Sequence, residues 1–247
     1  MTTLVLALVA GAVIGLALGG LGGGGSVLAV PALIYLLGFT PAEATTASLV
    51  IVTLTSVTAL TGHARDGNVV WRTGLLFAAA GIVPAMLAGA AAGHLPQAVL
   101  TVAFSVIAAL AAVRMLRPAR TGSTGPVSPG RAGAAGAGLG AVTGFLGVGG
   151  GFLAVPALVG VLKLPMRRAV GTSLLVITVN SLAALGARAG TGTHLDWAVI
   201  APFTAAAVLG AWDGKRLSKK LKGGTLQRVF AYVLLAVAVF MLVDALL

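Results

Sequence analysis

The chain contains no cysteine and few charged side chains. The lack of cysteine excludes disulfides, thiolate metal sites and cysteine nucleophiles. Only 9% of its 247 residues are charged and 58% are hydrophobic, whereas about a quarter of the residues of a soluble domain are charged. Uncharged stretches such as 2–38 and 75–93 could not remain exposed to water. We therefore predict that these stretches lie in a membrane.

Carboxylates are scarcer still, and all of them lie at the ends of predicted membrane segments. The five acidic residues and the three histidines all lie near segment ends. A buried carboxylate is the usual means of carrying a proton or binding sodium inside a membrane. We therefore expect no metal site and no cofactor.

Basic residues are in excess and give a net charge of +11. They lie in short loops between apolar segments, which is typical of a membrane protein with basic cytoplasmic loops and not of a nucleic-acid-binding surface. No Lys or Arg precedes the first apolar stretch, which argues against a signal peptide. We expect the lipid bilayer as a partner and no nucleic acid.

The two halves of the sequence repeat one pattern at an offset of 125 residues. Between Gly19 and Leu33, eleven of fifteen positions are identical to their partners between Gly144 and Leu158. Random apolar sequence would not hold one register over this length, so the pattern indicates a duplication. We predict a first membrane repeat at 1–117, a flexible cytoplasmic linker at 118–131 and a second, inverted repeat at 132–247.

Each half holds five apolar segments, at 2–18, 27–38, 44–62, 71–93 and 97–116, and at 132–144, 152–162, 169–187, 197–213 and 225–247. The last three of each half approach the ~20 residues that a spanning helix needs. The first two of each half are predicted to form a hairpin that enters and leaves on one side. Three crossings per half is an odd number, so the second copy must insert upside down.

The predicted fold is therefore an all-α integral membrane protein of two inverted-topology repeats, each a broken-helix hairpin plus three spanning helices. With the linker in the cytoplasm, fifteen of the sixteen basic residues lie on the cytoplasmic side and only Arg188 lies outside. Both termini are then extracytoplasmic. Inverted repeats with broken helices at matching positions are typical of secondary transporters.

The glycine-rich stretches 20–26 and 147–151 interrupt these hairpins. Each glycine costs a helix about 1 kcal/mol relative to alanine, and an unwound backbone in lipid must line a protein cavity. The next helices are predicted to begin near Ser26 and Gly151, with Ser26 as an N-cap. Their free N–H groups and positive dipole ends would form an anion site.

Packing is the alternative explanation for these glycines. It is the one we expect for the glycines that recur every four residues ahead of both stretches. These are Gly11, Gly15, Gly19, Gly136, Gly140 and Gly144.

The third segments add hydroxyls and one amide, Asn180. A hydroxyl can instead bond a carbonyl of its own helix, whereas a buried amide needs other partners. The predicted substrate-binding residues are Gly22, Gly24, Gly25, Ser26, Ser48, Gly147, Gly149, Gly150, Gly151, Ser173 and Asn180.

We expect no enzyme. An intramembrane hydrolase with Ser26 as its nucleophile would need a histidine within reach, and every histidine lies at a predicted membrane edge. His63 and its repeat partner Arg188 are expected to anchor the chain at the membrane interface.

The paired glycine-rich and Val-Pro-Ala-Leu motifs, with Ala47-Ser48-Leu49 and Thr172-Ser173-Leu174 downstream, resemble the TauE/SafE family of sulfite exporters. The resemblance covers almost the whole chain. The family motif maps onto Gly22, Gly24, Gly25 and Pro31, and onto Gly147, Gly149, Gly150 and Pro156. The resemblance implies transport of sulfite, a sulfonate or a related oxyanion across the inner membrane.

We expect alternating access at a midplane anion site, and export, because the membrane potential drives anions outward. An ion-coupled importer of an organic or sulfur-containing anion and a passive anion channel are the alternatives. The sequence leaves a homo-oligomer open.

Overall fold

The computed structural model describes residues 2–92, 97–116, 128–145, 151–188 and 195–246, which form helices and no strand. The first half contains α1 (Thr2–Leu21), α2 (Gly24–Pro31), the π-helical η1 (Ala32–Leu36), α3 (Pro41–Arg65), α4 (Trp71–Ala92) and α5 (Gln97–Leu116). The second half contains α6 (Pro129–Phe145), α7 (Gly151–Gly160), α8 (Met166–Arg188), α9 (Trp197–Lys220) and α10 (Gly223–Leu246).

The predicted all-α membrane fold is confirmed, with each apolar segment matched by a helix at the same place in the chain. Seven helices of the described residues are long and apolar enough to cross a membrane. Six are the predicted spanning segments, and the seventh is α1, which continues three residues beyond the predicted end at 18. α9 continues past 213 to Lys220, and α6 begins at Pro129, within the predicted linker.

Capping at the start of α3 shows how local sequence sets a helix boundary. Thr40 accepts a hydrogen bond from the Glu43 backbone N–H, and the Glu43 carboxylate accepts one from the Thr40 N–H, which makes a capping box. Pro41 is the first helical residue, where its missing N–H costs nothing. The capping box and Pro41 therefore fix the start of α3 shortly after η1 ends at Leu36.

The first helix of each half packs against the fourth helix of the other half, α1 on α9 and α6 on α4. Glycines allow both contacts, because an added Cβ would overlap a backbone carbonyl of the partner helix. The pairs are Gly11 with Phe203, Gly15 with Ala207, Gly19 with Ala211, Gly136 with Phe77, Gly140 with Gly81, and Gly144 with Ala85. The packing role predicted for these six glycines is confirmed, and we call the two contacts the glycine seams.

Three further contacts join equivalent helices of the two halves: α2 with α7, α3 with α8, and α5 with α10. α3 and α8 are antiparallel, because Arg188 donates to Thr46 at one end while Thr178 donates to the Ser56 hydroxyl, 3.0 Å away, near the middle. These three pairings, and the two glycine seams, are preserved when the halves are exchanged. This arrangement is consistent with the predicted inversion of the second repeat.

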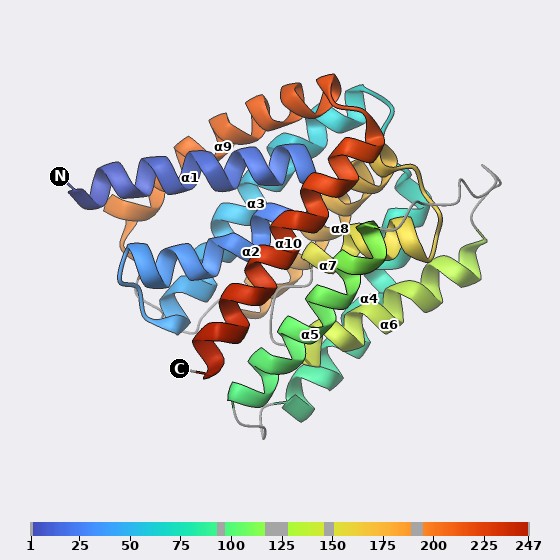
Figure 1. Ribbon diagram of the computed structural model, residues 1–247, viewed down its shortest axis with the longest axis horizontal. Coiled ribbons are helices and arrows are strands. Elements are labelled where there is room, and N and C mark those ends of the chain that lie inside the picture. The colour runs from blue at the N-terminus through green and yellow to red at the C-terminus, as the bar shows by residue number, and fades with distance from the viewer. Residues whose placement is uncertain (1, 93–96, 117–127, 146–150, 189–194, 247) are drawn as a thin grey trace.

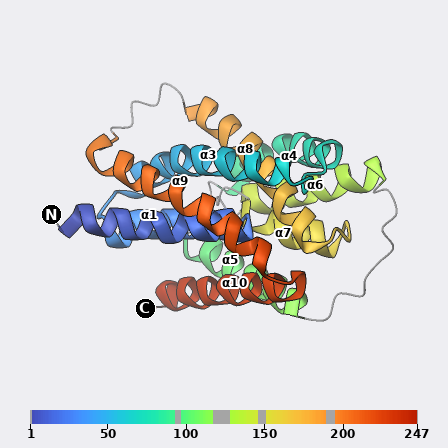
Figure 2. The same ribbon diagram turned by 90° about the horizontal axis from the view of Figure 1, so that it is seen from above.

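Several helix ends that carry basic residues gather at one end of the bundle, whereas Arg188 at the end of α8 lies at the other end of α3. α3 and α9 end side by side, the Arg167 guanidinium at the start of α8 donates to the Lys219 and Leu221 carbonyls, and Gln227 of α10 donates to the Met115 carbonyl of α5. α1 begins and α10 ends at the opposite end, on the left of Figures 1 and 2. The structure thus separates these basic helix ends from both termini.

Candidate functional site

The first glycine break is short and sharply defined. α1 ends at Leu21, and Gly22 follows with φ +72°, while its N–H donates to the Leu18 carbonyl over 2.8 Å. Glycine adopts this left-handed conformation without the clash that a Cβ would cause. Gly23 then caps α2, which runs back along α1. The predicted hairpin is therefore present, with a break of two residues.

Gly25 belongs to this hairpin contact and not to an open space. A Cβ added there would lie 2.6 Å from the Ile14 carbonyl oxygen of α1. The absence of a side chain at Gly25 lets α2 lie against α1. Its role in binding a substrate stays a prediction.

The first turns of α2 and α7 meet near the middle of the molecule, where Figure 1 shows both short helices among the longer ones. A Cβ added at Gly23 would lie 2.7 Å from Phe152 Cα, and one added at Gly151 would lie 2.9 Å from the Ser26 hydroxyl oxygen. Both positive helix ends therefore meet at a point that has no room for a further side chain.

α8 closes this junction on one side. Ser173 is fully buried, and a Cβ at Gly22 would lie 2.5 Å from its hydroxyl oxygen. A Cβ at Gly151 would likewise meet Ile177. The structure thus brings four predicted site residues into one contact region, which we call the central junction: Gly22, Ser26, Gly151 and Ser173. Gly24 is the first residue of α2.

Ser26 is not the N-cap that the sequence predicts. α2 begins two residues earlier, at Gly24, and Ser26 lies in its first turn, where its hydroxyl donates to the Gly23 carbonyl over 2.8 Å. Helix propensity alone would delay the start past the glycines, but packing of Gly23 against α7 holds them in helical geometry. The second helix begins at Gly151, as predicted.

The serines of the third helices satisfy themselves within their own helices. Ser48 donates to the Thr45 carbonyl and Ser173 to the Val170 carbonyl, each over 2.8 Å. Both hydroxyl oxygens keep lone pairs, but each hydrogen must rotate away from its carbonyl before it can contact an anion. In this conformation both hydroxyls therefore bond a carbonyl of their own helix, which was the alternative to lining a binding cavity.

Asn180 keeps an unsatisfied polar atom. Its Oδ1 is buried and has no hydrogen-bond partner among the described residues. A buried amide oxygen without a partner is costly, which is compatible with a place beside a binding site. Gly147, Gly149 and Gly150 lie outside the described residues.

Two pockets among the described residues lie away from the central junction. The larger, about 510 Å³, is an apolar groove between α1, α2 and α10, lined by Val9, Pro31, Tyr35 and Phe240 among others. It presents almost no polar group to an anion. The smaller, about 150 Å³, lies between α3 and α9 at the basic end of the bundle.

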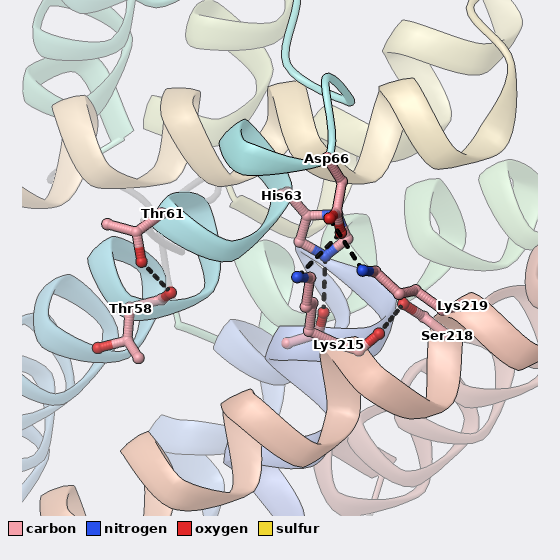
Figure 3. Close-up of polar contacts among 8 residues, drawn as sticks. Thr58, Thr61, His63, Asp66, Lys215, Ser218 and Lys219 are labelled. Carbon is pink, nitrogen blue, oxygen red and sulfur yellow. Dashed lines mark hydrogen bonds and ion pairs between the residues drawn. The ribbon is translucent and has the colours of Figure 1, made fainter.

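A charged cluster at this basic end was not found by sequence reasoning. Asp66 follows α3, and its two oxygens contact Lys219 Nζ at 2.8 Å and Lys215 Nζ at 2.9 Å (Figure 3). Hydrogen bonds from Lys219, and then from Lys215, lower the pKa of Asp66. The charge count placed both lysines on the cytoplasmic side, but it could not pair Lys219 with a carboxylate 153 positions earlier in the chain.

His63 was wrongly predicted to anchor the chain at the membrane interface. It lies within α3 and is only 4% exposed, and its Nε2 is 3.1 Å from the Gly19 carbonyl oxygen. Its repeat partner Arg188 donates to the Thr46 hydroxyl at the other end of α3. His63 thus ties α3 to α1.

Comparison with known proteins gives one consistent result. The family model described as sulfite exporter TauE/SafE matches residues 7–241. A "Probable membrane transporter protein" of Xylella fastidiosa strain 9a5c is 32% identical over 252 residues, covering 97% of this chain and 95% of the relative. A protein of the same description from strain Temecula1 is 31% identical with the same coverage. No solved structure matches the chain.

The duplicated motifs, the seven candidate spans and these relatives agree over nearly the full length. The chain is a multi-pass membrane protein and belongs to the sulfite exporter TauE/SafE family.

Proposed function

We propose that the protein is a secondary transporter that exports small sulfur-containing oxyanions, such as sulfite or a sulfonate, by alternating access at the central junction. The observation that carries this proposal is the meeting of the first turns of α2 and α7, with Gly23 and Ser26 against Gly151. Two helix N-termini offer unpaired N–H groups and positive partial charge to one small anion.

The chemistry of the surrounding residues supports an anion. The central junction is lined by glycine backbone, serine hydroxyls and aliphatic side chains, and Glu43, Asp66 and Asp196 lie at helix boundaries. An oxyanion would meet donors there without a nearby carboxylate to repel it. Rotation of the Ser26 and Ser173 hydroxyls away from their carbonyls would add two donors when an anion arrives.

In the conformation described, the junction has no space for an anion, because even a Cβ added at Gly23 or Gly151 would overlap a neighbouring atom. An anion could enter only if α2 or α7 moved relative to α8. The proposed movement is a rocking of the broken hairpins against the α3–α8 pair, because equivalent helices meet there in the same way in both halves. A state open to each side in turn would follow from exchanging the roles of the two halves.

Export needs no coupled ion if the membrane potential acts on the substrate. Moving one negative charge outward across 100 mV yields about 2.3 kcal/mol, which supports a gradient of roughly fifty-fold. The lack of a carboxylate at the central junction fits this energetic scheme better than proton or sodium coupling.

The test is flux of radiolabelled sulfite in proteoliposomes with imposed gradients. We expect radiolabelled sulfite to move toward the positive side. Unlabelled sulfite on the opposite side should stimulate this flux, and sodium and proton gradients should not change it. Stimulation by counter-flow would separate a carrier from a channel. Flux that requires a proton or sodium gradient, or no flux of any sulfur-containing anion, would contradict the proposal.

A further inference from the structure

The smaller pocket at the basic end of the bundle has the residues of a binding site that is separate from the central junction. It opens between α3 and α9 and has a volume of about 150 Å³. Gly62 and Thr58 form its α3 wall, and Trp212, Lys215, Arg216 and Lys219 form its α9 wall. We call it the α3–α9 pocket.

Positive charge exceeds negative charge in this pocket. Lys215 and Lys219 share the single carboxylate of Asp66, as Figure 3 shows. Arg216 lies 3.6 Å from Asp213, but both side chains are 67% exposed, so water screens this pair. One charge of the two lysines and much of that of Arg216 remain available for an anion.

Gly62 brings this charge close to the wall of α3. A Cβ at position 62 would lie 3.4 Å from Lys215 Nζ. Because Gly62 has no side chain, the Lys215 side chain can lie directly against α3. Lys215 is only 16% exposed, whereas Lys219 is half exposed. The pocket therefore has a fixed inner cation and two outer cations that can close over a ligand.

An apolar wall continues from the pocket along both helices. Leu54 is four residues before Thr58 on α3, and Leu209 is three residues before Trp212 on α9, so each pair shares a helix face. Leu54 and Leu209 are 49% and 69% exposed, on helices long enough to span a membrane. Hydrocarbon would cover this wall in a bilayer.

Trp212 lies between the charged and apolar parts. Its side chain is 46% exposed, and the Arg216 guanidinium carbon is 5.7 Å from its ring centroid. Tryptophan favours the level at which lipid headgroups meet hydrocarbon. Along the pocket, the cations are followed by an interfacial aromatic ring and then by an apolar wall. This order matches a phospholipid, whose charged phosphate is followed by the glycerol region and the acyl chains.

We propose that the α3–α9 pocket binds the phosphate group of an anionic phospholipid, whose acyl chains lie along Leu54 and Leu209. A free inorganic anion would use the cations but would gain nothing from the apolar wall. Basic pockets between membrane helices on the cytoplasmic side suit anionic headgroups, and this is the side on which the charge pattern places the pocket.

Trp212 offers a direct probe, because the chain has three tryptophans and the other two can be replaced. The full-length Trp71→Phe/Trp197→Phe protein is reconstituted in vesicles that contain brominated phosphatidylglycerol or brominated phosphatidylcholine, and quenching of Trp212 is measured. We expect phosphatidylglycerol to quench at a lower mole fraction. Equal quenching by the two lipids would overturn the proposal.

Matched variants assign the preference to the pocket. Arg216→Gln with Lys219→Gln should lower the preference about fivefold for each charge removed, while Lys220→Gln with Lys222→Gln, which removes the same net charge beside the pocket, should leave it unchanged. Equal losses in both variants would show a general surface attraction and would contradict a site. Asp66→Asn should raise the preference, because it frees both lysines.

Soluble anions provide the last arm. Inorganic phosphate and sulfite, added at matched ionic strength with chloride as control, should not relieve the quenching by phosphatidylglycerol. Relief by either anion beyond that by chloride would assign the pocket to a free oxyanion and overturn the lipid proposal.

Discussion

The glycine seams and the central junction use the same residue for different purposes. Along the seams, glycines at every fourth position of α1 and α6 remain helical and let two backbones touch over several turns. At the junction, Gly22 breaks the helix with a left-handed conformation, and Gly23 and Gly151 bring two helix starts together. The spacing of the glycines therefore separates a structural role from a candidate functional one.

The largest effect is expected from filling a seam. Gly140→Leu would drive its side chain into the Gly81 backbone of α4, and no rotamer can avoid a backbone contact at Cβ itself. Because overpacking costs about 1–3 kcal/mol even where side chains can move, we expect most of the folded protein to be lost. Fluorescence-detected size-exclusion chromatography in detergent measures this directly.

Gly138 supplies the control for the seam. It lies two residues away on α6, and a Cβ there meets nothing within 4 Å. Gly138→Leu should therefore give a normal elution profile. Equal losses in the two variants would mean that helix propensity, and not the seam, limits folding.

The second effect separates backbone strain from contact at the central junction. Gly22→Ala places a Cβ at φ +72° against the Ser173 hydroxyl, whereas Gly67→Ala meets the same strain at φ +69° with nothing within 4 Å. The left-handed conformation costs about 1–2 kcal/mol in either variant. We expect similar amounts of folded protein, at least a tenfold lower rate of sulfite flux in Gly22→Ala, and normal flux in Gly67→Ala.

If Gly22→Ala and Gly67→Ala lost flux equally, backbone strain alone would explain the loss, and the contact at the central junction would have no special role in transport. Flux should be divided by the amount of protein inserted into the vesicles, so that a defect in reconstitution is not counted as a defect in transport.

A smaller effect is expected from removing one hydroxyl. Ser173→Ala deletes a proposed anion donor, which is worth about 1.5–3 kcal/mol when the acceptor is charged, so the KM for sulfite should rise about tenfold or more. Ser105→Ala removes an equally buried hydroxyl on α5 that donates to the Thr101 carbonyl. It should change neither stability nor KM, and an equal rise in both variants would remove Ser173 from the site.

The smallest effect tests whether charges or the seam hold α9 in place. The lowered pKa of Asp66 means that its ion pairs stabilise the fold above the carboxyl's ordinary value near 3.8, and that this contribution is lost as the pH falls through the lowered value. Asp66→Asn should lower Tm by a few degrees at most at pH 7, and the difference from the original protein should vanish in acid. A large drop in Tm at pH 7 would mean that the ion pairs of Asp66, and not the glycine seam, hold α9 in place.

The helical architecture could be predicted because hydrophobic segments and glycine spacing are local properties. The repeat at an offset of 125 residues predicted which helices are equivalent, and each has a counterpart in the structure. The start of α2 could not be predicted, since it depends on the packing of Gly23 against Gly151 and of Gly25 against α1. Propensity carries no information about such a contact.

The same limit applies to single polar residues. His63 looks like an interfacial residue in the sequence because it lies near a segment end, but it is buried and bonds to the Gly19 carbonyl of α1, 44 positions earlier in the chain. Ser48 and Ser173 were predicted from their types and repeat positions, whereas their hydrogen-bond partners depend on rotamers that the sequence does not specify.

The central claim is that a small sulfur-containing anion binds where the broken helices meet. The chain has no cysteine, so a single Ser26→Cys variant in its own membrane can be labelled with a maleimide at one position. We predict that methanesulfonate and taurine slow labelling at position 26 and leave a Thr45→Cys control in the first turn of α3 unchanged. Equal labelling rates at position 26 with and without these anions would contradict the claim.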